Sequence, residues 1–268
     1  MTHALLALGS NLGDRAAVLS AAVAAIGNLS RTRVLKHSDW HATRPIGGPG
    51  GQGEFLNGAA LLETELPPGE LKSELQGIER HLGRERAERW AARTVDIDLL
   101  LYGERVIDEP ELEIPHPRMS FRPFVLAPAA EIAAEMIHPV LGASVGALWR
   151  HVQHARDVLA VCGGSAAERH SLAEQLRQRG LPLSELPDAV PQADCLFQQV
   201  AGSENISSGA IDDSAPKLVI NLSGTWADLP KPLRGLPTLA IEGADQQRLI
   251  EAAAAIEAVW PDLCRAAP

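Results

Sequence analysis

A run of arginines that leads directly into two aspartates constrains this chain more than any other stretch of its sequence. The segment Gly83–Asp98 reads GRERAERWAARTVDID and ends on Asp96 and Asp98, which are spaced as D-x-D. The apolar residues around these acids predict a buried strand over 95–102. Because side chains alternate between the two faces of a strand, we expect both carboxylates on one face and the apolar side chains on the other.

Two carboxylates beside a core strand are costly unless a cation or hydrogen-bond donors satisfy them. Mg²⁺ is commonly held by one or two carboxylates together with substrate phosphates, and guanidinium groups bind phosphate oxygens in a bidentate fashion. The pattern therefore predicts a magnesium and nucleoside-triphosphate site that contains Arg84, Arg86, Arg89, Arg93, Asp96 and Asp98. A run rich in Arg and Glu is usually a solvated helix face, but that interpretation does not account for Trp90 or for acids inside an apolar strand.

Length and charge narrow the class of protein. A chain of 268 residues is expected to form about two domains of about 150 residues each. The formal net charge of −10 argues against general nucleic-acid binding. The arginine run is then a local exception in an acidic protein, which favours a small anionic ligand.

The cysteines and the N-terminus indicate the compartment. Cys162, Cys195 and Cys264 show no C-x-x-C spacing, and this odd, sparse count fits a reducing cytosol without disulfides. The first residues lack a basic segment, and their apolar run is too short for a signal peptide. No uninterrupted apolar stretch approaches the ~18 residues of a transmembrane helix. We therefore expect a cytoplasmic protein.

Apolar periodicity and turn signals predict six elements in the first half: strands over 3–8, 31–42, 55–65 and 95–102, and helices over 15–27 and 69–82. The order strand-helix-strand-strand-helix-strand is the ferredoxin-like βαββαβ arrangement, an α+β fold. Turns over 104–117, a helix over 122–134 and a junction over 136–156 complete the prediction. The first domain is expected to span residues 1–150.

A second domain is expected over residues 157–268. The pattern predicts strands over 157–162, 217–222 and 238–241, helices over 165–179 and 245–259, and loops over 181–193 and 202–216. Strands that alternate with helices indicate a small α/β domain with a parallel sheet.

Four further motifs of the first half suit a nucleotide or heterocycle site. They are the strand-to-helix turn Gly9-Ser10-Asn11, the segment Thr43-Arg44-Pro45, the pair Phe55 and Asn57 on one strand face, and the group His116, Arg122 and Phe124. A turn that leads into a helix presents backbone N–H groups to an anion. Each motif taken alone also fits an ordinary structural role.

Together these motifs resemble the hydroxymethyldihydropterin pyrophosphokinases of folate biosynthesis. The resemblance rests on G-S-N-L-G-D, T-x-P, F-L-N, G-R-x-R-x-x-R-W-x-x-R-T-x-D-I-D and P-H-P-x-x-x-x-R-x-F-V-L-x-P, and it spans about residues 2–138. It implies transfer of pyrophosphate from ATP to the hydroxymethyl group of a reduced pterin, with release of AMP. It also implies two Mg²⁺ ions bound together with ATP.

The resemblance assigns a role to each matching residue. Asp96 and Asp98 hold magnesium, and Arg84, Arg93 and Asp98 are catalytic. The ATP site is implied to contain Gln76, Glu79, Arg89, Trp90, His116 and Arg122. The pterin pocket is implied to contain Thr43, Pro45, Phe55, Asn57 and Phe124.

The second half lies outside this resemblance. A phosphate-binding loop G-x-x-x-x-G-K-[ST] that starts at Gly163 has Glu168, Arg169 and His170 where Gly, Lys and Ser or Thr are required. The domain weakly resembles a shortened, degenerate P-loop nucleotide kinase, which favours a structural, oligomerising or regulatory role. An unrelated α/β fold is the alternative. For the whole chain, the alternatives are a nucleotide-binding regulator without turnover and an ATP-dependent transferase that acts on another heterocycle. The oligomeric state is not predicted.

Overall fold

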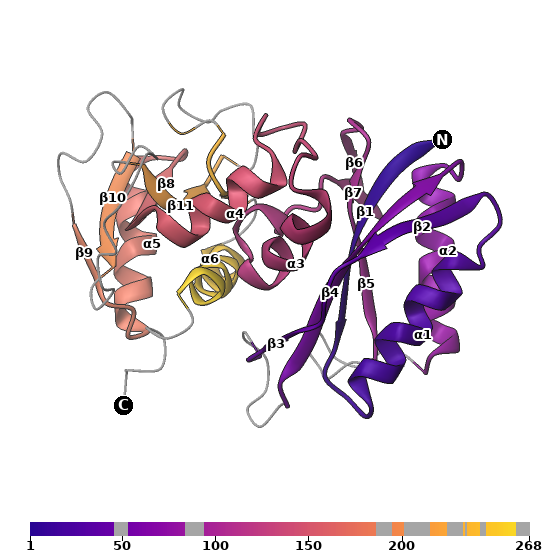
Figure 1. Cartoon of the computed structure of the whole chain (residues 1–268). Coiled ribbons are helices and arrows are strands. Elements are labelled where there is room, and N and C mark those ends of the chain that lie inside the picture. Colours follow the sequence, from indigo (N-terminus) through magenta and orange to yellow (C-terminus); the bar gives the residue numbers. More distant parts are fainter. Residues whose placement is uncertain are drawn as a thin grey trace. The chain divides into compact units, whose positions relative to one another are not determined.

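The computed structural model describes residues 1–45, 53–83, 94–185, 195–200, 215–223, 233, 235–241 and 245–260. Two compact units make up the chain (Figure 1). Unit 1 comprises Met1–Met119, Phe124–Pro139 and Ser144–Gly146, and unit 2 comprises Ser120–Pro123, Val140–Ala143 and Ala147–Pro268. The last change of unit therefore falls at Gly146, near the expected domain boundary, but two short segments before it belong to unit 2.

Unit 1 contains an antiparallel sheet with two helices on one face (Figure 1). In chain order its elements are β1 (Thr2–Ser10), α1 (Arg15–Gly27), β2 (Thr32–His37), β3 (His41–Thr43), β4 (Phe55–Thr64), α2 (Pro68–His81) and β5 (Asp96–Tyr102). The strand order is β2-β4-β1-β5, and β3 also pairs with β4. The strand-helix order predicted for the first half is therefore present, with β1 in the centre and β5 at an edge.

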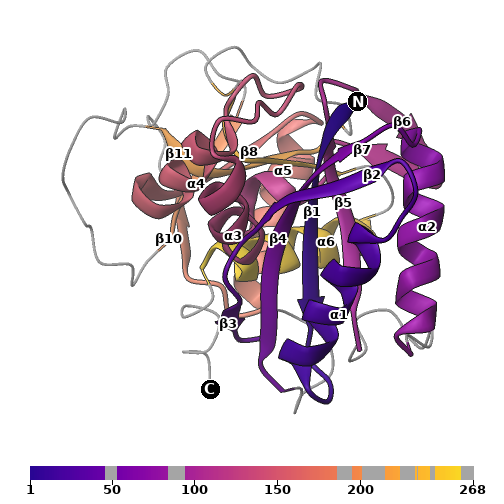
Figure 2. The ribbon, with the colours of Figure 1, turned by 45° about the vertical axis from the view of Figure 1, so that its right-hand side comes forward.

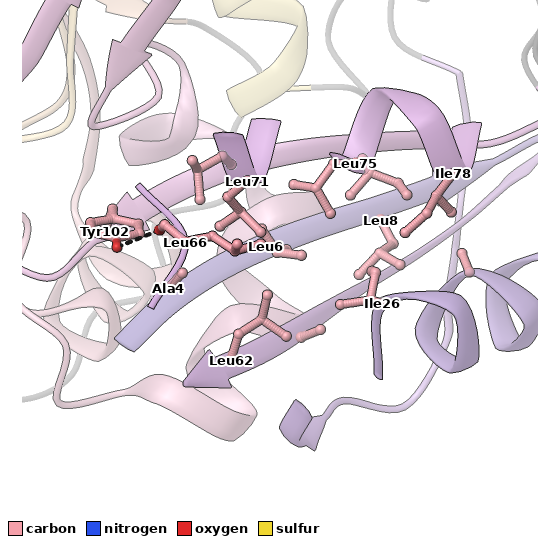
Figure 3. Close-up of a cluster of buried hydrophobic side chains, with 14 of the residues drawn as sticks. Ala4, Leu6, Leu8, Ile26, Leu62, Leu66, Leu71, Leu75, Ile78 and Tyr102 are labelled. Carbon is pink, nitrogen blue, oxygen red and sulfur yellow. Dashed lines mark hydrogen bonds between the residues drawn. The ribbon is translucent and has the colours of Figure 1, made fainter. Parts of the chain in front are cut away.

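Alternating apolar residues place the core between this sheet and its helices. Ala4, Leu6 and Leu8 of β1 point toward Leu71 and Leu75 of α2, as Figure 3 shows. The hydroxyl of Tyr102 donates to the carbonyl of Leu66 at 2.7 Å and closes one end of this cluster. By alternation, the other side chains of β1 and β5 lie on the opposite face of the sheet.

The prediction of a single strand over 31–42 is wrong, because the structure has two strands there, separated at Ser38–Trp40. His37 pairs with Ala60 and His41 with Asn57, so three residues of this strand face only two of β4. The extra residue forms a bulge. A Cβ at Gly58 would lie 2.4 Å from the indole of Trp40, so this ring packs directly on the glycine backbone.

Some short elements appear where the sequence predicted turns or a junction. β6 (Ile107–Glu109) and β7 (Leu112–Ile114) form a hairpin within 104–117, followed by the 3-10 turn Met119–Phe121. α3 (Pro123–Ala133) lies on the side of the sheet away from α1 and α2 (Figure 2). α4 (Val145–His154) lies in the predicted junction. Three-residue strands are too short to give a recognisable apolar alternation.

Unit 2 contains a mixed sheet rather than the predicted parallel one. Its elements are β8 (Arg156–Cys162), α5 (Ala166–Gln178), β9 (Leu183–Glu185), β10 (Cys195–Val200), β11 (Pro216–Asn221), β12 (Thr238–Ala240) and α6 (Asp245–Val259). The order is β12-β11-β8-β10-β9, in which β8, β11 and β12 are parallel and β10 is antiparallel to both its neighbours. β10 carries the buried Gln198, which accepts from Arg177 of α5 at 2.8 Å and breaks the apolar pattern of a strand.

A buried polar network joins the start of this sheet to the end of α6. Asp157 accepts from Lys217 at 2.5 Å and from the indole N–H of Trp260 at 2.6 Å. A buried charge without partners is strongly destabilising, and these two donors supply partners to the carboxylate of Asp157. No helix among the described residues has the length and apolar character needed to cross a membrane.

His138 makes the stability of unit 1 sensitive to acid. Burial lowers the pKa of His138 from 6.5 to about 4. Below pH 6.5 the unfolded chain binds a proton at this site that the folded chain does not bind until about pH 4. The free energy of unfolding is therefore expected to fall by about 3 kcal/mol as the pH drops through this window.

Urea unfolding of the wild type and of His138→Gln at pH 7, 6, 5 and 4 tests this expectation. The variant should lose less stability between pH 6.5 and 4, whatever its stability at pH 7. His3→Gln, at an exposed position on β1, is the control. Parallel curves for the wild type and His138→Gln would contradict the assignment.

Candidate active site

Asp96 and Asp98 open β5, the edge strand of unit 1, and border a pocket of about 360 Å³. The pocket runs along the outer edge of β5, between α2 and the β6–β7 hairpin. Its lining residues are Lys72, Leu75, Gln76, Glu79, Asp96, Ile97, Asp98, Leu99, Glu109, Pro110, Glu111, Leu112, Glu113, His116 and Pro117. Five residues expected in the ATP and metal site therefore line one pocket: Gln76, Glu79, Asp96, Asp98 and His116.

Glu79 fixes the strand that carries both aspartates. Its buried carboxylate accepts a hydrogen bond of 2.7 Å from the backbone N–H of Ile97, the residue between Asp96 and Asp98. An edge strand presents backbone groups that have no partner strand, and Glu79 satisfies one of them. The family resemblance implied a place for Glu79 in the ATP site, but the sequence gave no signal for this backbone contact.

The burial of Glu113 raises the pKa of its carboxyl group, and the nearby Asp108 adds to this effect. Glu113 lies on β7, on the side of the pocket opposite α2. The hairpin side of the pocket therefore brings several carboxylates close together.

His116 directs one ring nitrogen toward Asp98. Its Nδ1 accepts from the backbone N–H of Arg118 at 3.1 Å, so a neutral ring carries its proton on Nε2. Nε2 lies 3.9 Å from Oδ2 of Asp98. The backbone N–H of His116 donates to the carbonyl of Leu100 in β5 at 2.9 Å, which fixes the position of the ring beside the aspartates.

A second polar group lies on the face of the sheet away from α1 and α2. The side-chain amide of Asn57 donates to Oγ1 of Thr43 at 2.7 Å. Phe55 is directly opposite Thr43 in the β3–β4 ladder and shares the strand face of Asn57. Three of the residues expected in the pterin pocket, Thr43, Phe55 and Asn57, are thus adjacent.

The sheet register connects this polar group to the aspartates. Gly9 of β1 pairs with Asn57 on one side and with Asp96 on the other. A Cβ at Gly9 would lie 3.1 Å from Oδ1 of Asn57, so the glycine leaves room for the amide. Neighbouring strands are about 4.8 Å apart, which puts the backbones of Asn57 and Asp96 about 10 Å apart.

His41 is a candidate for positioning Asn57, and the sequence gave no indication of this role. Its Nε2 lies 2.5 Å from a carboxylate oxygen of Glu131 in α3, and the other oxygen accepts from the backbone N–H of Asp39. These contacts fasten β3 beside Asn57, which is opposite His41 in the ladder. The pair is 90 residues apart in the sequence, so no local pattern indicates it.

The remaining predicted residues fall into two groups. Some lie outside the described residues, and the others are described but do not line the pocket. Arg84, Arg89, Trp90 and Arg93 lie outside the described residues. The residues that border this interval are joined, because Oγ1 of Thr94 donates to the carbonyl of Gly83 at 3.2 Å. Arg122 and Phe124 flank the start of α3, and Pro45 follows β3; all three are half-buried.

Known proteins resemble the first half of this chain in sequence. The sequence profile of the 7,8-dihydro-6-hydroxymethylpterin-pyrophosphokinase (HPPK) family matches residues 5–134. The 2-amino-4-hydroxy-6-hydroxymethyldihydropteridine pyrophosphokinase of Haemophilus influenzae is 44% identical over 139 residues, which are 52% of this chain and 86% of that protein. The chain belongs to the HPPK family. The protein of the same name from Bacillus subtilis is 45% identical over 133 residues, 50% of this chain and 79% of that protein.

The similarity to the HPPK family does not extend over the whole chain. The family profile ends at residue 134, and these two relatives cover about half of the sequence. A crystal structure of Plasmodium falciparum HPPK-DHPS with pteroate is 14% identical, with a TM-score of 0.44. The match covers 56% of this chain and 42% of that one.

In unit 2, the turn Gly163-Gly164 is bound by a side chain of the helix that follows it. Gly163 and Gly164 have positive φ angles of 69° and 56°. The guanidinium of Arg169, which stands at the lysine position of the predicted phosphate loop, donates to the carbonyls of both glycines at 3.1 and 2.9 Å. The guanidinium of Arg169 therefore binds the backbone of the turn that precedes its own helix.

Glu168 is held in the same turn. It completes a capping box with Ser165 at the start of α5, and it accepts from Arg248 of α6 at 2.8 Å. Hydrogen bonds from Ser165 and Arg248 lower the pKa of Glu168 to about 2. The cavity beside these residues measures about 10 Å³, room for about one water molecule. The P-loop ancestry of unit 2 stays a prediction.

Replacement of Glu79 tests its contact with β5. Glu79→Ala leaves the buried N–H of Ile97 without this acceptor, so we expect the free energy of unfolding to fall by about 1–3 kcal/mol. Glu79→Gln retains a carbonyl oxygen and should lose less. Glu74→Ala, at an exposed position of α2, is the matched control in urea unfolding. Equal stability of Glu79→Ala and Glu74→Ala would contradict the role.

Proposed function

We propose that the chain transfers the pyrophosphoryl group of ATP to the hydroxymethyl oxygen of 6-hydroxymethyl-dihydropterin and releases AMP. Membership in the HPPK family supports this reaction, and the folate pathway is its expected context. The observation that carries the proposal is the row Asn57–Gly9–Asp96, in which the amide of Asn57 on β4 and the carboxylate of Asp96 on β5 flank the central strand β1. The two alternatives, a nucleotide sensor and a transferase for another heterocycle, have no such support.

The proposed pterin site uses the amide of Asn57. An amide presents a donor and an acceptor side by side, which matches the polar edge of a pterin ring. The ring of Phe55 lies on the same strand face and offers an apolar surface for stacking. We assign Thr43 to the orientation of the amide, because its hydroxyl accepts from Nδ2 of Asn57. Pro45 and Phe124 remain assigned to this pocket by the family resemblance.

The donor set at the start of β5 fits magnesium. Asp96 and Asp98 supply two half-buried carboxylates that border the pocket, and oxygen ligands suit this ion. When bound, Mg²⁺ neutralises triphosphate charge and aligns the reacting phosphoryl group. We assign Nε2 of His116, which lies 3.9 Å from Oδ2 of Asp98, as a donor to a phosphate oxygen, and the amide of Gln76 on α2 as a further ATP contact.

We further propose that unit 2 has a structural or regulatory role instead of a catalytic one. Its glycine turn is bound by Arg169, Glu168 pairs with Arg248, and the cavity beside these two residues measures about 10 Å³, room for about one water molecule. A nucleotide requires a cavity of several hundred Å³.

The full-length protein with Mg-ATP and 6-hydroxymethyl-dihydropterin should release AMP in a pterin-dependent manner. Asp98→Asn keeps the size of the side chain and removes its charge, so we expect it to abolish AMP release. Asp108→Asn, on the exposed β6 strand, is the control and should stay active. Full activity of Asp98→Asn would refute the metal assignment, and absence of AMP from the wild type would refute the reaction.

Arg93 is expected to act on the transition state. Removal of an arginine that stabilises a transferring phosphoryl group costs roughly 10³–10⁵ in rate. Arg93→Ala should therefore lower kcat by about this factor and change the Kd of Mg-ATP far less. Single-turnover kinetics and calorimetric binding measure the two quantities. A variant that loses affinity and keeps its kcat would show that Arg93 contributes to binding alone.

A further inference from the structure

Lys72 has a distinct place in the pocket beside Asp96 and Asp98. It is the one lysine or arginine among the described residues that line this pocket. Its half-buried side chain forms no hydrogen bond or ion pair with any residue that the structure describes. An ammonium group in a pocket wall, next to several carboxylates but without an ion pair among the described residues, is available to a ligand.

The position of Lys72 along α2 indicates which part of a ligand it reaches. Lys72, Gln76 and Glu79 follow the i, i+4, i+7 spacing of one helix stripe. With a rise of 1.5 Å per residue, Lys72 lies about 10 Å along the helix axis from Glu79. Because Glu79 binds the N–H between the two aspartates, Lys72 lies toward the far end of the pocket from the metal ligands.

The two ends of the pocket also differ in charge. The β6–β7 hairpin contributes Glu109, Glu111 and Glu113, which would repel phosphate groups. Phosphates are favoured at the aspartate end, where the proposed magnesium site lies and where Gly83 and Thr94 border the arginine segment. The uncharged nucleoside, with hydroxyl and amine donors for carboxylates, suits the remainder of the pocket.

We propose that Lys72 contributes to the affinity for ATP by contacting its nucleoside part, with its ammonium group donating to a ring nitrogen of the base or to a ribose oxygen. This inference rests on the proposed function, because it assumes that ATP binds with its phosphates at Asp96 and Asp98. It assigns the apolar stem of Lys72 to the pocket wall and its charged end to ligand recognition.

The test compares Lys72→Met, which keeps the length of the stem, with Lys36→Met. Lys36 is exposed on β2, at the opposite edge of the sheet. Calorimetry with Mg-ATP and with magnesium tripolyphosphate, together with AMP-release kinetics, should be run on the full-length proteins. Lys72→Met should raise the Kd and KM for ATP about tenfold, as expected for a lost charge-assisted hydrogen bond.

Tripolyphosphate affinity, kcat and the KM for the pterin should remain unchanged in Lys72→Met, and Lys36→Met should match the wild type. Unchanged ATP affinity would overturn the inference while the reaction stands. An equal loss for ATP and tripolyphosphate would overturn it too, because Lys72 would then contact phosphates. If the wild type binds Mg-ATP without releasing AMP, the proposed reaction fails, yet the affinities still decide the role of Lys72. A wild type that binds no ATP overturns both.

Discussion

The register of β1 between β4 and β5 is the constraint on which the candidate site depends. Burial of alternate apolar residues of β1 against α1 and α2 fixes this register, because a slip by one residue would turn the entire apolar set away from these helices. The same register places Gly9 between Asn57 and Asp96. Hydrophobic burial on one face of the sheet thus determines which polar side chains meet on the other.

Electrostatics then explains why the arginine run and the aspartates belong together. The pocket wall carries carboxylates from α2, β5 and the β6–β7 hairpin, and Lys72 is the one lysine or arginine of its described lining. A polyanion that binds there requires additional positive charge, and magnesium and the arginines of 84–93 are the expected sources. The excess of carboxylates in the described lining therefore favours a metal-bound triphosphate over a bare anion.

Sequence patterns predicted the order of elements in unit 1 and singled out Asp96, Asp98 and His116, because periodicity and motif spacing are local features. Gln76 and Glu79, which line the same pocket, were implied only by the resemblance to the HPPK family. Sequence patterns did not predict features set by distant contacts. The bulge at Ser38–Trp40 depends on an indole that packs against Gly58, and the strand around Gln198 depends on Arg177 of α5. The contact of His41 with Glu131 depends on the place of α3, which no local pattern encodes.

The position of the site at a sheet edge has a physical basis. An edge strand presents backbone donors and acceptors that would pair with other chains if left open. In β5 the N–H of Ile97 is bound by Glu79, and the carbonyl of Leu100 accepts from the N–H of His116. Leu100 is also the residue that the register of β1 skips, since Leu5 pairs with Leu101 and Leu6 with Leu99. Two residues expected to bind ATP therefore also close the edge of the sheet, so the stability of β5 and the geometry of the site depend on the same contacts.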